Sequence, residues 1–286
     1  MGDDGLFQLN DDPFMIHTGI AYLFLSVWLL PLYGLIMTAL YVRDRRQPNI
    51  TNKLMNIING CEAGQAICHV ITSSVLFFPN LAIAYNPTVR IFGCTANTLF
   101  IGQFPATTVL AISRILIFTQ VIQTKKMHII IKMVLAISYI WLLFVLLYGC
   151  ISQNMNFYPP AWGYDSSVAY ADLFSILELC VTLPCLATSY ISYIVIAFLI
   201  YTKKQSQSKT YRREELAIMI QYTFVTTYIT VLIAMWHNGA YLFEMTPFAN
   251  AFLNSCWIVA SYINPIFLLL LNKQIRNEVK KLLKSR

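Results

Sequence analysis

The chain has 286 residues, of which 57% are hydrophobic and 12% are charged, and its formal net charge is +7. A soluble protein carries about twice that charged fraction, so the composition predicts a polytopic membrane protein without a separate soluble domain long enough to fold alone. The positive charges lie in short loops between apolar segments, which favours the ordinary basic excess of membrane proteins over a nucleic-acid-binding surface.

Seven apolar segments are long enough to cross a bilayer, which takes about 20 residues. The first follows an acidic N-terminal stretch and is expected to act as its own targeting signal. The second and sixth are the least apolar. We therefore expect an all-α bundle of seven transmembrane helices within residues 1–272. The predicted spans are residues 17–42, 53–78, 91–120, 129–150, 171–201, 214–241 and 248–271.

The Lys and Arg residues are distributed unevenly between the two sides of this predicted bundle. Of the 20 Lys and Arg residues, all but Arg90 fall on one side. The positive-inside rule makes that side cytoplasmic. The N-terminus is then outside the cell membrane and the C-terminus inside. Opposite locations of the two ends require an odd number of spans, which agrees with seven and disagrees with six or eight.

The longest external segment, residues 151–170, is rich in proline and aromatic residues. Two interpretations remain open for it. It forms a lid over a pocket, or it is a plain connector whose aromatic side chains lie at the membrane interface. The residues in question are Tyr158, Pro159, Pro160, Trp162 and Tyr164.

The end of the chain combines a proline-containing span with a charged segment. Pro265, next to Asn264, removes a backbone donor and is expected to kink the last span. Residues 273–286 are predicted to form an amphipathic helix on the membrane surface, with its cations toward anionic headgroups. Its apolar face is formed by Ile275, Val279, Leu282 and Leu283.

This arrangement resembles the last span and short surface helix of G-protein-coupled receptors. The run from Asn264 to Arg276 is most similar to the large nematode serpentine chemoreceptor families, although Leu268 replaces the tyrosine of the usual Asn-Pro-x-x-Tyr motif. Residues 214–224, Glu-Glu-Leu followed by Gln-Tyr-Thr-Phe, resemble the start of span six in the same receptors. The resemblance implies a chemosensory receptor for an extracellular small molecule that signals to a heterotrimeric G protein.

An arginine at the cytoplasmic end of span three, Arg114, resembles the centre of the Asp-Arg-Tyr signature of these receptors. Ser113 occupies the position of the acid, and Ile115 that of the aromatic residue. The resemblance implies that Arg114 bonds to span six in the inactive packing and then contacts the G protein. Glu214 or Glu215 would supply the missing acidic partner. The alternative is an arginine that snorkels from a helix end.

A carboxylate at membrane depth is costly unless it is paired, which makes Glu62 of span two a functional candidate. Glu62 lies ten residues after Asn52, a spacing that resembles the one between Asn and the buried acid in rhodopsin-like receptors. The resemblance implies that Glu62 faces Asn264 beside Pro265. The alternative is a protonated Glu62 bonded to a neighbouring carbonyl, which would still support helix packing.

A ligand would enter from outside, between the outer halves of spans three, five, six and seven. Glu178 is the intramembrane acid in that region, and it would either pair with an amine or bond to a neighbouring helix. The candidate ligand-binding residues are Phe100, Gln103, Phe174, Glu178, His237, Tyr241, Asn254 and Trp257.

The receptor resemblance also implies a disulfide between the outer end of span three and the second external loop. Cys94 lies 20 residues before Arg114, which is about 30 Å along a helix. The loop over residues 151–170 has no cysteine, so Cys150 at the outer end of span four is the nearest candidate partner. An extracellular location permits a Cys94–Cys150 disulfide.

The sequence contains no pattern that indicates catalysis. Its four histidines are scattered without paired metal-ligand spacing, and there is neither a Gly-rich phosphate loop nor a nucleophile elbow. We therefore expect no enzymatic activity, no cofactor, no metal and no nucleic-acid partner.

Three alternatives to a signalling receptor remain. A transporter would show an internal repeat and broken helices in matching positions of two halves, and the sequence shows neither. A ligand-gated channel with seven spans would have its N-terminus inside, which the charge distribution opposes. A receptor that reaches the membrane without signalling is compatible with the altered motifs around Arg114 and Asn264.

Overall fold

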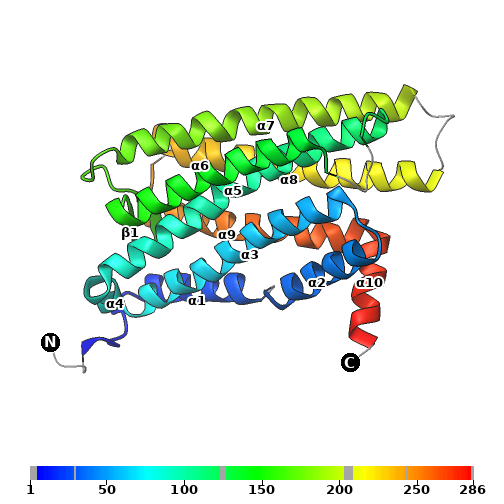
Figure 1. Cartoon of the computed structure of the whole chain (residues 1–286). Coiled ribbons are helices and arrows are strands. Elements are labelled where there is room, and N and C mark those ends of the chain that lie inside the picture. Colours follow the sequence, from blue (N-terminus) through cyan, green and yellow to red (C-terminus); the bar gives the residue numbers. More distant parts are fainter. Residues whose placement is uncertain (1–4, 29, 123–126, 203–208, 243, 285–286) are drawn as a thin grey trace.

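A computed structural model describes residues 5–28, 30–122, 127–202, 209–242 and 244–284, without the side chains of residues 209–215 and 240. Within these ranges the chain forms a bundle of long, roughly aligned helices with one short β-hairpin (Figure 1). The predicted all-α, seven-transmembrane fold is confirmed, and the hairpin is an addition to it.

The first span consists of two helices, and each of the other six consists of one. Six spans are long and apolar enough to cross a membrane by length and composition alone. The helices that form the spans are α1 (Pro13–Val27) with α2 (Leu30–Arg46), α3 (Ile50–Phe77), α5 (Asn86–Phe118), α6 (Ile129–Ser152), α7 (Ala171–Thr202), α8 (Lys209–Leu242) and α9 (Pro247–Leu271).

The seventh span is α3, whose many polar residues lower its hydropathy. Its 28 residues are long enough to cross a bilayer. The polar side chains face the interior of the bundle: Asn52, Asn59, Glu62, Gln65 and His69 are all buried. Polar groups at this depth are expected to avoid lipid and face neighbouring helices.

The span predicted over residues 17–42 is present as one apolar segment, Pro13–Arg46, that contains two helices. The first span is divided between α1, which ends at Val27, and α2, which begins at Leu30. Pro31 lies in the first turn of α2, where its missing N–H is tolerated, whereas inside a continuous helix its ring would clash with a preceding carbonyl. The proline therefore explains why a new helix starts here.

The hairpin lies at one end of the bundle and packs into it. Strands β1 (Met155–Tyr158) and β2 (Ala161–Tyr164) are antiparallel, with Met155 opposite Tyr164. A short helix, α4 (Pro79–Ala84), lies between α3 and α5 at the same end (Figure 1). Because Met155 and Trp162 are buried, the structure favours the lid interpretation of this segment over a plain connector.

The opposite end carries α10 (Lys273–Lys284), which runs across the bundle rather than along it (Figure 1). Asn272 caps this helix, since its Oδ1 accepts from the backbone N–H of Gln274 and of Ile275. Ile275 and Val279 are buried against the core at this end. The predicted amphipathic helix is thus present, although Leu283 on its expected apolar face is 56% exposed.

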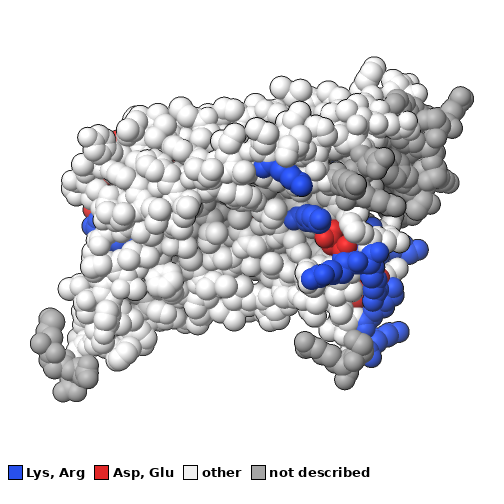
Figure 2. All heavy atoms as spheres, viewed as in Figure 1, with Lys and Arg blue, Asp and Glu red and all other residues white. Residues whose placement is uncertain are grey.

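The two ends of the bundle differ in charge. Figure 2 shows Lys and Arg side chains gathered around α10, while the long sides of the molecule carry few charges. The described chain begins at the end with the hairpin and finishes at the end with α10 (Figure 1). We call these the hairpin end and the α10 end.

Candidate functional site

Two helices that face each other in the bundle, α3 and α9, carry matching rows of hydrogen-bonding side chains. In each row the residues recur at intervals of three and four, which places them on one face of the helix. All of them are buried. We call this contact the α3–α9 seam, and it consists of Glu62, Gln65, His69 and Thr72 on α3 with Asn254, Trp257, Ser261 and Asn264 on α9.

The part of the seam nearer the α10 end is hydrogen-bonded through Glu62 Oε2 and Asn264, whereas Glu62 Oε1 and Ser261 Oγ have no partner among the described residues. Glu62 Oε2 accepts from the Asn264 side-chain amide and from the Tyr33 hydroxyl, both at 3.3 Å. The Tyr33 hydroxyl also contacts the carbonyl of Ser261. Gln221 Nε2 of α8 donates to Asn264 Oδ1. This network joins α2, α3, α8 and α9, and it agrees with the expectation that Glu62 faces Asn264.

In the middle of the seam stands Trp257. Its indole N–H donates to Gln65 Oε1 at 3.2 Å. Its ring packs against Phe100 and Trp236, with centroid distances of 4.6 Å in both cases. Trp257 therefore touches α3, α5 and α8 from its position on α9, and it lines two separate small cavities.

At the hairpin end of the seam, His69 and Asn254 are buried but not hydrogen-bonded. Among the described residues, neither ring nitrogen of His69 and neither polar atom of Asn254 has a hydrogen-bond partner. The Tyr22 hydroxyl lies within interaction range of the Asn254 side chain, but it donates to the carbonyls of Pro160 and Ala251. Buried polar atoms are nearly always paired, so two such residues together indicate a site for an exogenous partner.

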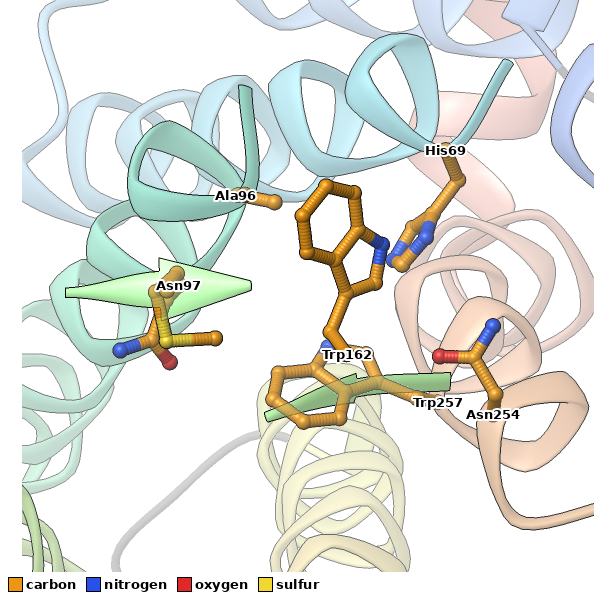
Figure 3. Close-up of a pocket in the computed structure, with 8 residues that line it drawn as sticks. His69, Ala96, Asn97, Trp162, Asn254 and Trp257 are labelled. Carbon is orange, nitrogen blue, oxygen red and sulfur yellow. The ribbon is translucent and has the colours of Figure 1, made fainter. Parts of the chain in front are cut away.

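His69 and Asn254 line one cavity, and Trp162 of the hairpin covers it (Figure 3). The free space measures about 10 Å³, which is roughly the volume that one water molecule requires. The Trp162 indole N–H donates to Thr72 at the last position of the seam, at 2.9 Å. In this conformation the site is closed by the tryptophan and holds no more than a very small molecule.

Trp162 fits over the cavity because Gly93 of α5 leaves room for its ring. A Cβ atom added at Gly93 would lie 2.4 Å from the indole ring, a distance that real Cβ contacts do not show. A glycine is therefore required at position 93 because the Trp162 ring occupies the space of a side chain, and not because the backbone of the helix needs a special conformation there.

The hairpin is fastened to the bundle by an ion pair and by tyrosine hydroxyls. Arg90 donates to Asp165 at 2.7 Å and to the carbonyl of Gln153 at 2.8 Å. The hydroxyl of Ser167, and after it Arg90, holds the pKa of Asp165 below its ordinary value. On the other side of the hairpin, Tyr22 bonds to the carbonyl of Pro160 at 2.9 Å.

Glu178 lies beside the second cavity, and its carboxylate is partnered within the protein. Its Oε2 accepts from the Tyr164 hydroxyl at 2.7 Å and from the Asn97 amide at 3.3 Å. Of the two roles predicted for it, bonding between neighbouring elements is the one that this geometry shows. Phe100, His237 and Trp257 line the same cavity, so the predicted ligand residues around Trp257 do come together.

Three other predicted ligand residues lie elsewhere. Phe174 stacks on Tyr148 of α6, with a centroid distance of 4.2 Å. Tyr241 is 89% exposed. Gln103 is buried on α5 but lines neither cavity beside Trp257. The structure does not bring these three residues to the two cavities beside Trp257, because helix position alone does not give the rotation of each helix about its own axis.

Sequence reasoning missed several residues of the site. His69 of span two was outside the expected set because only spans three, five, six and seven were considered. The contact of Asn97 with Tyr164 and that of Trp162 with Thr72 were missed, because the sequence does not give the path of the segment 151–170 over the bundle. Polar residues three and four apart on α3, at Glu62, Gln65, His69 and Thr72, are the signal that could have indicated the seam.

The predicted switch residues occupy the α10 end. Arg114 is half-buried near the end of α5, and the preceding Ser113 is buried with its hydroxyl donating to the carbonyl of Leu110. The side chains of Glu214 and Glu215 lie outside the described part, so their proximity to Arg114 stays a prediction. Helix α9 continues through Pro265 to Leu271.

The predicted Cys94–Cys150 disulfide is not present in the structure. Both cysteines are free thiols. The Cys94 Sγ donates to the carbonyl of Gly149 at 3.1 Å and to the side chain of Asn154 at 3.4 Å. Arg90 of α5 and Asp165 after the hairpin form an ion pair that links these two segments.

A comparison with known protein families matches residues 10–286 to the serpentine type seven-transmembrane chemoreceptor family Srt, a group of G-protein-coupled receptors. The match covers nearly the whole chain, including the hairpin and α10. No functionally curated protein matches the chain.

Proposed function

The chain belongs to the Srt family of serpentine seven-transmembrane chemoreceptors, and from this premise we propose that it binds an extracellular small molecule at the hairpin end of the α3–α9 seam and signals to a heterotrimeric G protein at the α10 end. The family is one of receptors rather than of enzymes. The observation that carries the proposal is the pair of buried, unpartnered side chains His69 and Asn254.

The orientation follows from charge. The positive-inside rule places the Lys- and Arg-rich α10 end in the cytoplasm. The hairpin end, which carries the paired Arg90, then faces the outside together with the N-terminus. A ligand from outside would meet the hairpin first and His69 and Asn254 beneath it.

The ligand would supply hydrogen bonds that the protein lacks. His69 offers one donor and one acceptor in its neutral form, and the Asn254 amide offers both kinds. A ligand with a matching polar group removes the cost of burying these atoms unpaired, which is about 1–3 kcal/mol per group. Since the cavity now has room for about one water, binding requires that Trp162 moves and that a more open form is populated.

One face of α9 connects this site with the cytoplasmic half. Asn254 and Trp257 line the cavity, and Ser261 and Asn264 follow on the same face. Asn264 is bonded to Gln221 of α8. A rotation of α9 upon ligand binding would therefore pull on α8, and the bonded network around Glu62 is the element with two possible arrangements that such coupling requires.

The response at the cytoplasmic end follows from the same network. Movement of α8 would change the surroundings of Arg114 at the end of α5, and Arg114 with the basic loops would then contact the G protein. Glu214 and Glu215 at the start of α8 stay the proposed acidic partners of Arg114 in the resting form. Loss of Arg114 without loss of signalling would contradict this step.

The test is a potency measurement on the Asn254→Leu variant. The full-length receptor is expressed in cells and exposed to a panel of small molecules, with G-protein activation as the readout. Asn254→Leu removes the unpaired amide, so we expect unchanged or higher thermal stability together with loss of ligand response. A purely structural Asn254 would give lower stability, and unchanged potency would reject the site.

The matched control is Asn52→Leu. Like Asn254, Asn52 is a buried amide side chain whose Nδ2 has no hydrogen-bond partner among the described residues, but it lies far from the cavity, at the other end of α3. It is expected to retain ligand potency. Equal loss of potency in both variants would show that the effect is not specific to the hairpin end of the seam.

A further inference from the structure

We infer that the ligand reaches this site from the bilayer, through an apolar groove between α8 and α9, and that it is therefore a small lipophilic molecule. The inference rests on the proposed function and specifies the chemistry of its ligand. Its basis is a cavity that opens toward lipid, is larger than the two cavities beside Trp257, and shares a wall with one of them.

The groove has room for a small molecule. Its free space measures about 250 Å³, compared with about 10 Å³ for each cavity beside Trp257. Val231 of α8 and Phe252 of α9 line it and are 57% and 62% exposed on the side of the bundle that lipid would cover. A molecule dissolved in the bilayer can therefore enter without crossing the protein.

In contrast to the groove, the route from the extracellular water to this site is closed. Trp162 covers the cavity of His69 and Asn254 and is itself buried. The hairpin that carries it is held by the Arg90–Asp165 ion pair and by Tyr22. Entry from this side requires these contacts to break, whereas entry from the groove requires movement of one leucine and then of Trp257, which lines both small cavities.

That leucine is Leu232 of α8. It lines both the groove and the cavity that contains Glu178, His237 and Trp257. Leu232 is almost fully buried, so its side chain separates the two spaces. A change of its rotamer would join the groove to the interior, where Trp257 also lines the cavity of His69 and Asn254.

The lining of the groove sets the class of ligand. Its walls are apolar, and the hydroxyl of Tyr228 is already used, since it donates to the carbonyl of Cys256 at 2.8 Å. The body of the ligand must then be apolar. A single polar group on it would find partners further in, first at the unpartnered Nε2 of His237 and then at His69 and Asn254.

The experiment is photolabelling of the full-length receptor in phosphatidylcholine vesicles with an octanol that carries a diazirine, followed by mass spectrometry of the adducts. We expect adducts on the groove residues Phe252 and Cys256 and at Trp257, in excess of those at the lipid-exposed Ile194 of α7, and displaced by unlabelled octanol. Equal labelling of Ile194 and the groove would overturn the inference.

Two matched variants test the route. Ala249→Trp fills the groove, and Ala234→Trp places the same ring on the exposed face of α8. The first is expected to lose the adducts at Phe252 and Trp257, and the second to retain them. Retention of the Trp257 adduct in Ala249→Trp would show that the probe enters by another path.

A phospholipid with a diazirine in its acyl chain serves as the competing occupant. If it labels the groove and octanol does not displace it, the groove is a lipid-chain site and the inference is wrong. The labelling needs no signalling, so a receptor that responds to no tested ligand would contradict the proposed function without affecting this result.

Discussion

The two ends of the α3–α9 seam are built from the same two helices, are equally buried, and differ in their hydrogen bonding. Toward the α10 end, Glu62 and Asn264 are bonded to each other and to neighbouring helices. Toward the hairpin end, His69 and Asn254 have no partner among the described residues. At the first end the two side chains are bonded to each other, with Glu62 Oε1 and the Ser261 hydroxyl still unpartnered among the described residues; at the second end both side chains lack any partner, which is why we propose it as the binding site.

This difference separates a structural use of buried polar residues from a functional one. A closed network fixes the packing of helices, because each member leaves a costly unpaired atom when its partner is removed. An open pair contributes nothing to packing and is costly by itself. Its presence in a bundle that could have placed leucines there is the reason why we propose a binding role for it.

The largest effect is expected from breaking the closed end. Glu62→Leu leaves the Asn264 amide without its acceptor and the Tyr33 hydroxyl with the Ser261 carbonyl alone. We expect a loss of about 1.5–4.5 kcal/mol, from about 1–3 kcal/mol for the unpaired amide and about 0.5–1.5 kcal/mol for the lost hydroxyl hydrogen bond. Thermal unfolding in detergent measures it. Glu62→Gln keeps an acceptor and should lose less than half as much; equal losses would mean that hydrogen bonding at this position is not what stabilises the packing.

A smaller effect is expected from forcing the hairpin off the open end. Gly93→Ala places a methyl group against the Trp162 ring, and overpacking of this kind costs about 1–3 kcal/mol. The control is Gly34→Ala, where a Cβ would meet nothing within 4 Å. Tryptophan fluorescence should show Trp162 more exposed in the first variant alone, and an unchanged spectrum would contradict the close contact.

The ion pair that holds the hairpin gives a pH dependence. In the folded protein the pKa of Asp165 is lowered, first by Ser167 and then by Arg90. The resulting stability is complete above the ordinary Asp pKa of about 3.9 and is lost as the pH falls through the lowered folded value. The protection factors of the β1 and β2 amides, which are corrected for the intrinsic pH dependence of exchange, should therefore be constant from pH 7 to about 5 and fall in stronger acid.

Asp165→Asn should remove that acid-induced loss of protection and lower the protection factors already at neutral pH, by an amount equivalent to about 1.5–3 kcal/mol for a hydrogen bond to a charged group. A hairpin that opens with the same pH profile in the variant would show that another group controls it.

The smallest effect is expected at the corresponding ion pair of the α10 end. Arg46 lies 3.1 Å from Glu278, but its side chain is 62% exposed. Solvent screening reduces such pairs to about 0–1 kcal/mol, so Arg46→Ala should change the unfolding temperature little, and less still at high salt. A loss comparable to that of Asp165→Asn would mean that α10 depends on this pair rather than on the burial of Ile275 and Val279.

The fold was largely accessible from the sequence, because apolar length and the Lys and Arg distribution are properties of whole segments. The break before Pro31 was not expected, since an apolar segment looks continuous whatever its backbone does. The site was accessible in part. Trp257, Asn254 and Glu178 were placed near each other by helix depth, whereas Phe174 and Tyr241 were misplaced because depth does not give the rotation of a helix.

The hairpin residues were the hardest to predict. Trp162 reaches Thr72 and Gly93 through a tertiary fold of the segment that no helical periodicity describes. The expected Cys94–Cys150 disulfide came from resemblance alone, and the structure has free thiols at both positions.

The most direct test of the difference between the two ends is a pair of double-mutant cycles on thermal stability, measured with and without an agonist found by screening. For Glu62 and Asn264 we expect a coupling energy of about 0.5–3 kcal/mol in both conditions. For His69 and Asn254 we expect none without agonist, and a coupling in the same range once agonist is bound. Strong coupling of His69 and Asn254 in the absence of any ligand would show that the hairpin end is closed as well, and would contradict its assignment as the binding site.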